Sequence, residues 1–224
     1  MNLEEFENKI EYKFKDIKLL KNAFTHTSYA NENKVQSNEK LEFLGDAILE
    51  FTVSEYLYKN YKTLKEGEMT KVRATVVCED SLYKIATKYH FEELLYLGRS
   101  ERLSGGAQKP AILADSVEAV IAAIFMDSGI EEARKFIVEN LKDEIEKASK
   151  NVGQKDYKTV LQEELQKHGS VKIEYEIIEE KGPDHDKTFV SEVKCDGKVL
   201  ATGSGNTKKQ AEMEAARKAL EIKK

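Results

Sequence analysis

Apolar residues recur with a helical period over the first two thirds of the chain. They repeat about every three to four residues, the spacing that places them on one face of an α-helix. Breaks that contain glycine, near residues 67, 98, 105–106 and 129, separate the periodic segments. The segments with this period are residues 19–24, 38–59, 66–88, 109–127 and 130–148. The pattern predicts an all-α domain over residues 1–148.

The period changes after a short polar segment. Lys147 to Lys155 is rich in small and polar residues and has no apolar face to bury, so we expect residues 149–155 to link two domains. Beyond it, apolar residues alternate as they do in strands, and Asp196-Gly197 is typical of a hairpin turn. The expected elements are a helix near 156–168, strands near 173–177, 189–195 and 199–204, and a helix over 207–221. Residues 156–224 therefore predict an α+β domain of order α-β-β-β-α.

Composition places the chain among ordinary globular proteins. Of its 224 residues, 40% are hydrophobic and 34% are charged, which excludes a disordered or fibrous chain. Glu118 interrupts the longest apolar run before the roughly 18 residues that a membrane span needs, and the acidic start lacks the basic region of a signal peptide. We expect a cytosolic protein without a membrane partner. Cys78 and Cys195 lie in different predicted domains, which favours reduced, core or near-core thiols over a disulfide or a zinc site.

Three acids interrupt the apolar pattern of residues 38–49. Glu39, Glu42 and Asp46 fall at about 0°, 300° and 340° around an ideal helix, so they form one narrow stripe. Like charges on an apolar helix repel each other and are costly to desolvate unless a positive charge faces them. Glu50 falls about 20° from Glu39, so spacing alone does not exclude it. Because it lies at the end of the stripe, we interpret Glu50 as a solvated acid.

A second acidic pair lies in residues 111–126, which are apolar on nearly every face and predict a buried central helix. Asp115 and Glu118 are one turn apart and are the only charges in this segment. A buried carboxylate must be protonated, paired with a cationic side chain or bound to a metal. Either acidic set alone is compatible with solvent exposure or with pairing to Lys and Arg. Two such sets in apolar helices favour a metal centre.

The ligand chemistry indicates which metal this centre would hold. Carboxylate oxygens without histidine or cysteine favour Mg²⁺, with Mn²⁺ as a substitute, over zinc. A divalent ion among carboxylates is typical of phosphodiester hydrolysis, because the ion activates water and shields charge on the phosphate. No small-molecule cofactor is expected.

At this point the residues resemble a known family. Asn38-Glu39-Lys40-Leu41-Glu42-Phe43-Leu44-Gly45-Asp46-Ala47-Ile48-Leu49 closely resembles the signature of ribonuclease III. His26-Thr27-Ser28-Tyr29-Ala30-Asn31-Glu32 and Ile112 to Glu118 match neighbouring blocks of that family, and the match continues into the second domain. The metal-centre residues that the resemblance implies are Glu42, Asp46, Asp115 and Glu118, with Asp46 and Glu118 as the catalytic core.

The resemblance implies further residues and a partner. It places Glu39 and Glu66 in the catalytic valley, although without the motif match Glu66 would be interpreted as a helix-dipole partner. It also implies a homodimer with one catalytic centre per protomer at the ends of a shared valley. Phe43 matches a residue that docks into the partner, and an ordinary core aromatic is the alternative. Two alternatives remain open for the glycine-rich segment Gly98 to Gly106. It could contact phosphates through backbone N–H groups and arginines, or it could be a plain flexible loop.

The second domain resembles a double-stranded-RNA-binding domain at each of its three contact regions. Such a domain reads the wide minor groove and the phosphates of the duplex, not the base sequence. The first helix carries polar side chains on related faces, a loop carries His185, and the last helix starts with two lysines. The residues that the resemblance assigns to RNA are Thr159, Gln162, Glu163, Gln166, His185, Lys208 and Lys209.

Net charge limits how RNA would be bound. The chain carries −5 overall, and residues 156–224 carry 13 basic against 14 acidic residues, so binding must depend on a few placed lysines. The resemblance implies an endoribonuclease that cuts double-stranded RNA into products with 5′-phosphate and 3′-hydroxyl ends and a short 3′ overhang. It also implies maturation of ribosomal RNA precursors and of some messenger and small RNAs. The alternative is a catalytically silent RNA-binding adaptor whose first domain only dimerises.

Overall fold

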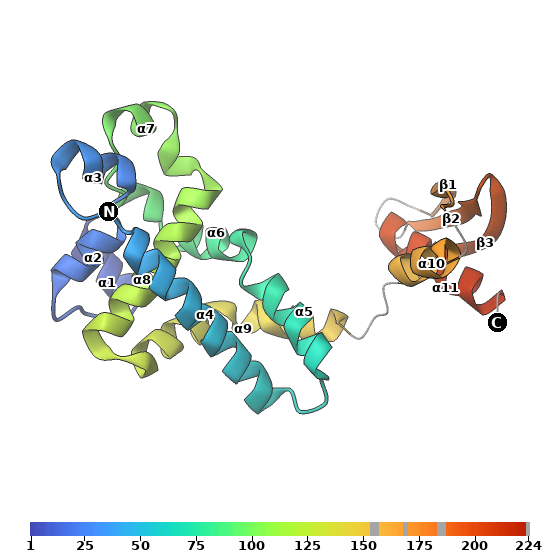
Figure 1. Ribbon diagram of the computed structural model, residues 1–224, viewed down its shortest axis with the longest axis horizontal. Helices are drawn as coiled ribbons and strands as arrows, with labels where there is room; N and C mark the ends of the chain where they lie inside the picture. Colours follow the sequence, from blue (N-terminus) through green and yellow to red (C-terminus); the bar gives the residue numbers. More distant parts are fainter. Residues whose placement is uncertain (153–156, 168–169, 183–186, 223–224) are drawn as a thin grey trace. The chain divides into compact units, whose positions relative to one another are not determined.

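The chain forms two compact units, Met1–Gly153 and Gln154–Lys224. The computed structural model describes residues 1–152, 157–167, 170–182 and 187–222 (Figure 1). The division between the units falls inside the segment expected to be a linker. The last helix of the first unit, α9 (Ile130–Asn151), nevertheless extends into that segment, so residues 149–151 are helical.

The described part of the first unit is helical, as expected. Its elements before α9 are α1 (Leu3–Lys9), α2 (Ile17–Ala23), α3 (Thr27–Asn33), α4 (Glu39–Asn60), α5 (Glu66–Val76), α6 (Glu79–Lys88), η1 (Phe91–Glu93), α7 (Arg99–Leu103), η2 (Gly106–Gln108) and α8 (Pro110–Ser128). The expected segment 66–88 is two helices instead of one. Cys78 has an extended backbone and caps α6, whose first turn carries Glu79 and Asp80, acids that favour a helix start.

Helix α8 forms the centre of the first unit, as the sequence predicts. Eleven of its residues are buried, and it packs against α2, α4, α6 and α9. Pro110 occupies its first turn, where a missing N–H costs nothing, and Gly129 ends it at φ +86°. No helix in the described residues combines the length and apolarity needed to cross a bilayer.

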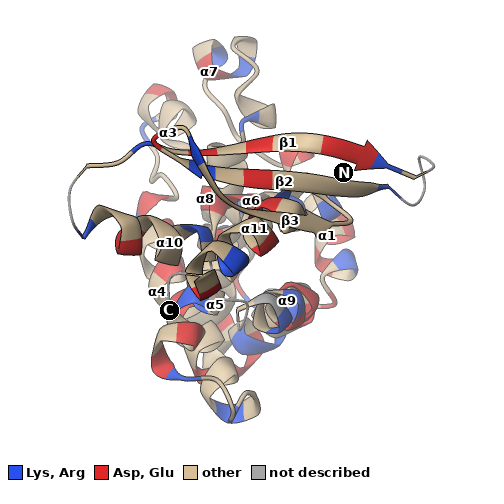
Figure 2. Cartoon of the chain, turned by 90° about the vertical axis from the view of Figure 1, so that its right-hand side faces the viewer, with Lys and Arg blue, Asp and Glu red and all other residues tan. Residues whose placement is uncertain are grey.

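The second unit has the expected α-β-β-β-α order. Its elements are α10 (Tyr157–Gln166), β1 (Ile173–Lys181), β2 (Thr188–Cys195), β3 (Lys198–Gly205) and α11 (Lys208–Ile222). The strands form an antiparallel sheet in the order β1-β2-β3, and α10 and α11 lie on one side of it (Figure 2). Asp196 and Gly197 have φ of +48° and +78° at the β2–β3 turn, the conformation that an Asp-Gly hairpin turn requires.

Small residues let α11 lie directly on the sheet. A Cβ atom added to Gly203 of β3 would lie 2.1 Å from the backbone nitrogen of Ala215 on α11. Ala211 and Ala219 of the same helix are also buried. The middle of α11 therefore lies against the backbone of β3. Both cysteines are free, but Cys78 is exposed, so the expectation of near-core thiols is wrong for that residue.

Candidate functional site

The two acidic sets meet where α4 and α8 touch. A Cβ atom on Gly45 would lie 1.9 Å from the carbonyl oxygen of Glu118, a distance that real Cβ atoms do not show. Glycine at position 45 is therefore required for this approach. Asp46 follows it directly on α4, so the close approach of the two backbones places Asp46 beside Glu118.

The acids affect one another's charge. Burial, together with the charges of Asp46, Asp115 and Glu42, raises the pKa of Glu118 to about 8. Burial also raises the pKa of Glu42, with the charges of Asp115, Glu39 and Asp46 acting in the same direction. These couplings show that the five acids form one electrostatic cluster across two helices.

The carboxylates of this cluster lack compensating cationic side chains. No Lys or Arg nitrogen in the described residues lies within ion-pair distance of Glu42, Asp46, Asp115 or Glu118. The neighbouring Glu50 differs, because its carboxylate lies 3.1 Å from Nε of Arg73 on α5. The Glu50 side chain is 41% exposed, as expected of a solvated acid, but it also has a cationic partner that the sequence did not reveal. Its charge is balanced within the protein, and the charges of the cluster are not.

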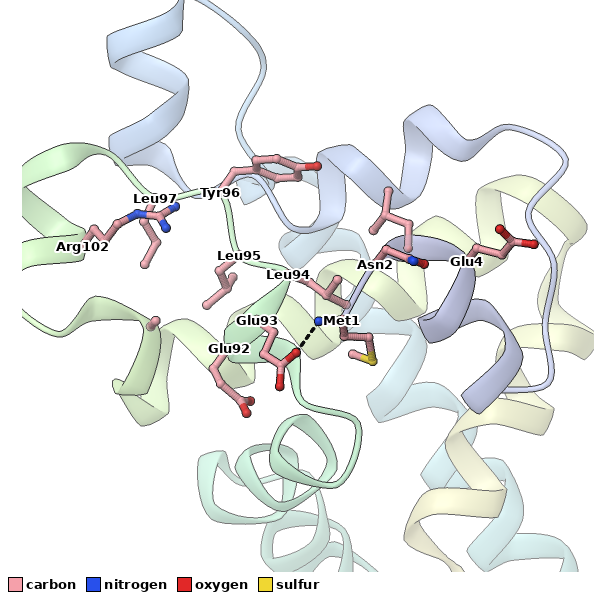
Figure 3. Close-up of a pocket in the computed structure, with 12 residues that line it drawn as sticks. Met1, Asn2, Glu4, Glu92, Glu93, Leu94, Leu95, Tyr96, Leu97 and Arg102 are labelled. Atoms are coloured by element: carbon pink, nitrogen blue, oxygen red, sulfur yellow. Dashed lines mark hydrogen bonds and ion pairs between the residues drawn. The ribbon is translucent and has the colours of Figure 1, made fainter.

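A second group of possible metal ligands lies elsewhere. The ligand atoms of His90, Glu92 and Glu93 lie within 4.8 Å of one another, and the four cluster acids do not meet that criterion in the described residues. Glu93, however, binds the amino group of Met1 at the edge of a pocket (Figure 3), and that hydrogen bond lowers the pKa of Glu93. Its charge is already balanced. The α4–α8 cluster, in which the pKa values of Glu42, Asp115 and Glu118 are raised, is the better candidate for a cation.

The structure separates the two remaining predicted acids. Glu39 is the first residue of α4, accepts a hydrogen bond from Ser37 at 2.7 Å and contributes to the cluster's charge. Glu66 lines a pocket with Ser54 and Tyr58 in the second half of α4. At 1.5 Å per residue, that is about 12–18 Å further along the helix than Asp46. Within one protomer, Glu66 is not part of the cluster.

An exposed apolar stripe runs along α4. Phe43 is 80% exposed, which excludes the core-aromatic alternative, and Phe51 and Tyr58 are 55% and 70% exposed. On an ideal helix, all three lie within about 80° of one another. Exposed aromatic residues in a row mark an interaction surface. The sequence analysis did not single out Phe51 and Tyr58, although their spacing from Phe43 carries the signal.

The upstream motif supports the site from behind. Burial and the charge of Glu79 raise the pKa of Asp115. His26, which caps α3, acts in the opposite direction, because its charge lowers that pKa by a smaller amount. The side chain of Asn38 is buried and donates to the carbonyl of Ala23 at 3.3 Å, which fixes the start of α4. The sequence analysis assigned His26 no role, since its proximity to Asp115 depends on chain segments far apart in sequence.

The glycine-rich segment is ordered by the same motif. Ser28 Oγ accepts a hydrogen bond from the backbone N–H of Gly98 at 2.9 Å, and Glu32 accepts from that of Arg99 at 2.9 Å. The segment forms α7 and η2 and is not a plain loop. The N–H groups of Gly98 and Arg99 are already bonded, so these two groups are not free to contact a phosphate.

The predicted RNA contacts lie on helix surfaces of the second unit. The exposed α10 residues are Thr159, Gln162, Glu163 and Gln166, while Leu161 and Leu165 of the same helix are buried. Lys208 and Lys209 begin α11 and are exposed, and Thr207 Oγ1 accepts from the N–H of Gln210 at 3.2 Å. His185 lies outside the described residues.

Comparisons with known proteins agree with this two-unit arrangement. A family model described as Ribonuclease-III-like matches residues 16–145, and one described as Double-stranded RNA binding motif matches residues 157–223. The chain is 49% identical to a Ribonuclease 3 of Clostridium tetani, over 99% of this chain and 94% of that protein. It is 48% identical to a Ribonuclease 3 of Caldanaerobacter subterraneus, over 96% and 95%. A solved nuclease domain of ribonuclease III from Campylobacter jejuni, with a region involved in dimer formation, covers 64% of this chain and 98% of that one, at 38% identity and a TM-score of 0.61.

Proposed function

The chain belongs to the ribonuclease III family, and from this membership we propose how its own residues perform the reaction. It is an endoribonuclease for double-stranded RNA, with a nuclease domain followed by a double-stranded-RNA-binding domain. The adaptor alternative finds no support, since the chain matches proteins named Ribonuclease 3 over nearly its full length. The observation that carries the proposal is the uncompensated acid cluster at the contact of α4 with α8.

The family consists of divalent-metal-dependent nucleases, and we propose Mg²⁺ as the ion, with Mn²⁺ as a substitute. The cluster fits such an ion because it offers hard carboxylate oxygens, and no Lys or Arg among the described residues lies within ion-pair distance of its four proposed ligands. The proposed ligands are Glu42, Asp46, Asp115 and Glu118. When bound, the ion supplies positive charge that activates water and stabilises the phosphate during hydrolysis.

The residues of the chain have distinct proposed roles. With its pKa raised to about 8, Glu118 holds a proton at neutral pH, and it would have to release that proton to serve as a metal ligand. Asp46 and Glu118, opposed across the α4–α8 contact, form the catalytic core. Glu39 lies at the rim of the cluster and acts as an outer helper that orients water or substrate.

A homodimer completes the proposed site. The apolar stripe that begins at Phe43 is the proposed contact surface, because burying it against a second copy removes exposed aromatic area from water. Glu66 is too far along α4 to reach the cluster of its own protomer. We propose that it acts across the dimer, where two centres cut opposite strands. The offset of the cuts would leave 5′-phosphate and 3′-hydroxyl ends with a short 3′ overhang.

RNA binding is assigned to one face of the second domain. Gln162 and Glu163, with Thr159 and Gln166 on the same helix, would contact one minor groove and His185 the next, with Lys208 and Lys209 on the phosphates between them. The proposed cellular roles are maturation of ribosomal RNA precursors and processing of some messenger and small RNAs. A cytoplasmic location follows from these substrates, since bacterial transcripts are processed there.

Cleavage of a labelled RNA duplex tests the assignment. Glu118→Gln and Asp46→Asn should bind the duplex but not cut it when Mg²⁺ is present. Glu50→Gln is the matched control, an acid one turn beyond Asp46 whose partner is Arg73, and it should cut at nearly the wild-type rate. Wild-type cleavage by Glu118→Gln would refute the assignment. Loss of Mg²⁺-dependent cleavage in Glu93→Gln, with cleavage retained in Glu118→Gln, would move the metal site to the group at His90.

A further inference from the structure

The two lysines at the start of α11 are in different electrostatic states. The ammonium group of Lys208 lies 3.2 Å from the carboxylate of Glu180, near the end of β1. Lys209, its neighbour, forms no ion pair within the part of the chain that the structure describes. The two residues occupy successive positions of one helix and are both exposed. Among the residues that the structure describes, Lys208 has an anionic partner and Lys209 has none.

The position of Lys208 is defined by three elements. Glu180 of β1 pairs directly with Phe189 of β2 in the antiparallel register. The ammonium group of Lys208 lies over the ring of Phe189, 5.6 Å from its centroid, as well as against Glu180. A cation over an aromatic face is attracted by the ring's quadrupole. One anion and one ring therefore hold the lysine side chain against the sheet.

The backbone beneath Lys208 is equally well defined. A Cβ atom on Gly205, the last residue of β3, would lie 2.6 Å from Cβ of Gln210 and 2.8 Å from the nitrogen of Ala211. The first turn of α11 is thus fixed on the strand. Glu180 can therefore be reached by Lys208 without any movement of the helix. Other acids on β1 have their own partners, as Glu179 has with Lys181 at 2.9 Å. Figure 2 shows the acidic residues along β1.

We propose that the carboxylate of Glu180 competes with an RNA phosphate for the ammonium group of Lys208. The inference rests on the proposed role of Lys208 in phosphate binding. When duplex RNA binds, Lys208 exchanges the carboxylate of Glu180 for a phosphate, so the ion pair has to be broken first. Lys209 makes no such exchange. Glu180 therefore limits affinity for RNA, and the two lysines contribute unequally to it.

The magnitude follows from the exposure of the pair. The side chains of Lys208 and Glu180 are 61% and 43% exposed. Exposed ion pairs are worth about 0.2–1 kcal/mol, so removing the competing charge should tighten binding by about 1.4-fold to fivefold. The gain should be largest at low salt, because surface charges are screened as ionic strength rises.

The test measures duplex RNA binding by the full-length protein in EDTA, which prevents cleavage. Glu180→Gln should lower the dissociation constant by about 1.4-fold to fivefold. Glu179→Gln removes an identical charge one residue away, whose partner is Lys181, and should change it much less. In a Lys208→Gln background the effect of Glu180→Gln should disappear. In a Lys209→Gln background it should persist.

Each outcome has one meaning. Weaker or unchanged binding by Glu180→Gln overturns the proposal, and so does a gain that survives in the Lys208→Gln background. An equal gain from Glu179→Gln also overturns it, since the effect would then be general charge repulsion. If Lys208→Gln by itself leaves RNA binding unchanged, the assigned phosphate contact fails instead. Near-ultraviolet and far-ultraviolet circular dichroism of each variant verifies that the fold is retained.

Discussion

Replacing Glu118 with Gln tests the electrostatics of the acid cluster through stability, independently of cleavage. Burial, together with the charges of Asp46, Asp115 and Glu42, raises the pKa of Glu118 from 4.5 to about 8. A carboxyl with a raised pKa binds its proton more tightly in the folded protein than in the unfolded chain. The stability that it contributes is therefore fully present below about pH 4.5 and is lost as the pH rises through about 8.

The size of the effect can be worked from that pKa. At 1.36 kcal/mol per pH unit, the rise in the pKa of Glu118 from 4.5 to about 8 means that its ionisation lowers the free energy of unfolding by at most about 5 kcal/mol. Glu118 is only partly buried, so solvent screening reduces this to about 1–2 kcal/mol. Because Gln has the same shape and no charge, Glu118→Gln should be more stable than the wild type by about 1–2 kcal/mol at pH 8.5. At pH 4.5 the difference should be close to zero.

Thermal and urea unfolding in EDTA, followed by circular dichroism between pH 4.5 and 8.5, measure this difference. For a unit of this size, the expected gain at pH 8.5 corresponds to a rise of about 2–8 °C in Tm. Glu50→Gln is the matched control, since Arg73 already balances Glu50 and removing that charge should bring no gain. Equal or lower stability of Glu118→Gln at pH 8.5 would refute the reasoning. So would a gain of the same size at pH 4.5.

Four further predictions follow from the geometry. Gly45→Ala should lose about 1–3 kcal/mol of stability and most of its cleavage activity, because the added Cβ overlaps the backbone of α8. Gly67→Ala is the control, since the space around Gly67 is open, and it should fold and cut normally. Calorimetry and a cleavage assay compare the two variants. Phe43→Glu should sediment as a monomer, and a retained dimer would remove the apolar stripe from the interface. Mixed dimers of Glu66→Gln and Glu118→Gln protomers should regain one intact centre and nick a single strand, and no recovery would show that Glu66 acts within its own protomer. The RNA association constant should fall steeply between 50 and 200 mM salt, as counterion release requires, and a flat response would contradict phosphate binding by placed lysines.

Period and turn chemistry predicted most of the secondary structure. The helices over 38–59, 109–127 and 130–148 are present with small shifts at their ends, and so are the three strands with their Asp-Gly turn. Residues 66–88 were predicted as one helix because apolar spacing continues across the break. The extended backbone at Cys78 that ends this continuity leaves no apolar signature of its own.

The site was less accessible to sequence reasoning. Helical angles placed Glu39, Glu42 and Asp46 on one stripe, but they could not show that Arg73 claims Glu50, because that ion pair joins different helices. The family match grouped Glu66 with the other acids, but within one protomer Glu66 lies beside the second half of α4, away from the cluster. His26 was noticed only as part of a motif. Its effect on Asp115 comes from tertiary packing, which no local spacing encodes.

The backbone contact at Gly45 also bears on how freely this protein can change. Main-chain atoms, rather than the fit of core side chains, set the separation of α4 and α8 at the point where Asp46 faces Glu118. Substitutions among surrounding core residues such as Leu49 and Val117 can then lower stability while leaving that separation intact. In a deep mutational scan, tolerance for stability and tolerance for activity should diverge around the site. Position 45 should be the point at which they coincide, with glycine alone accepted in both.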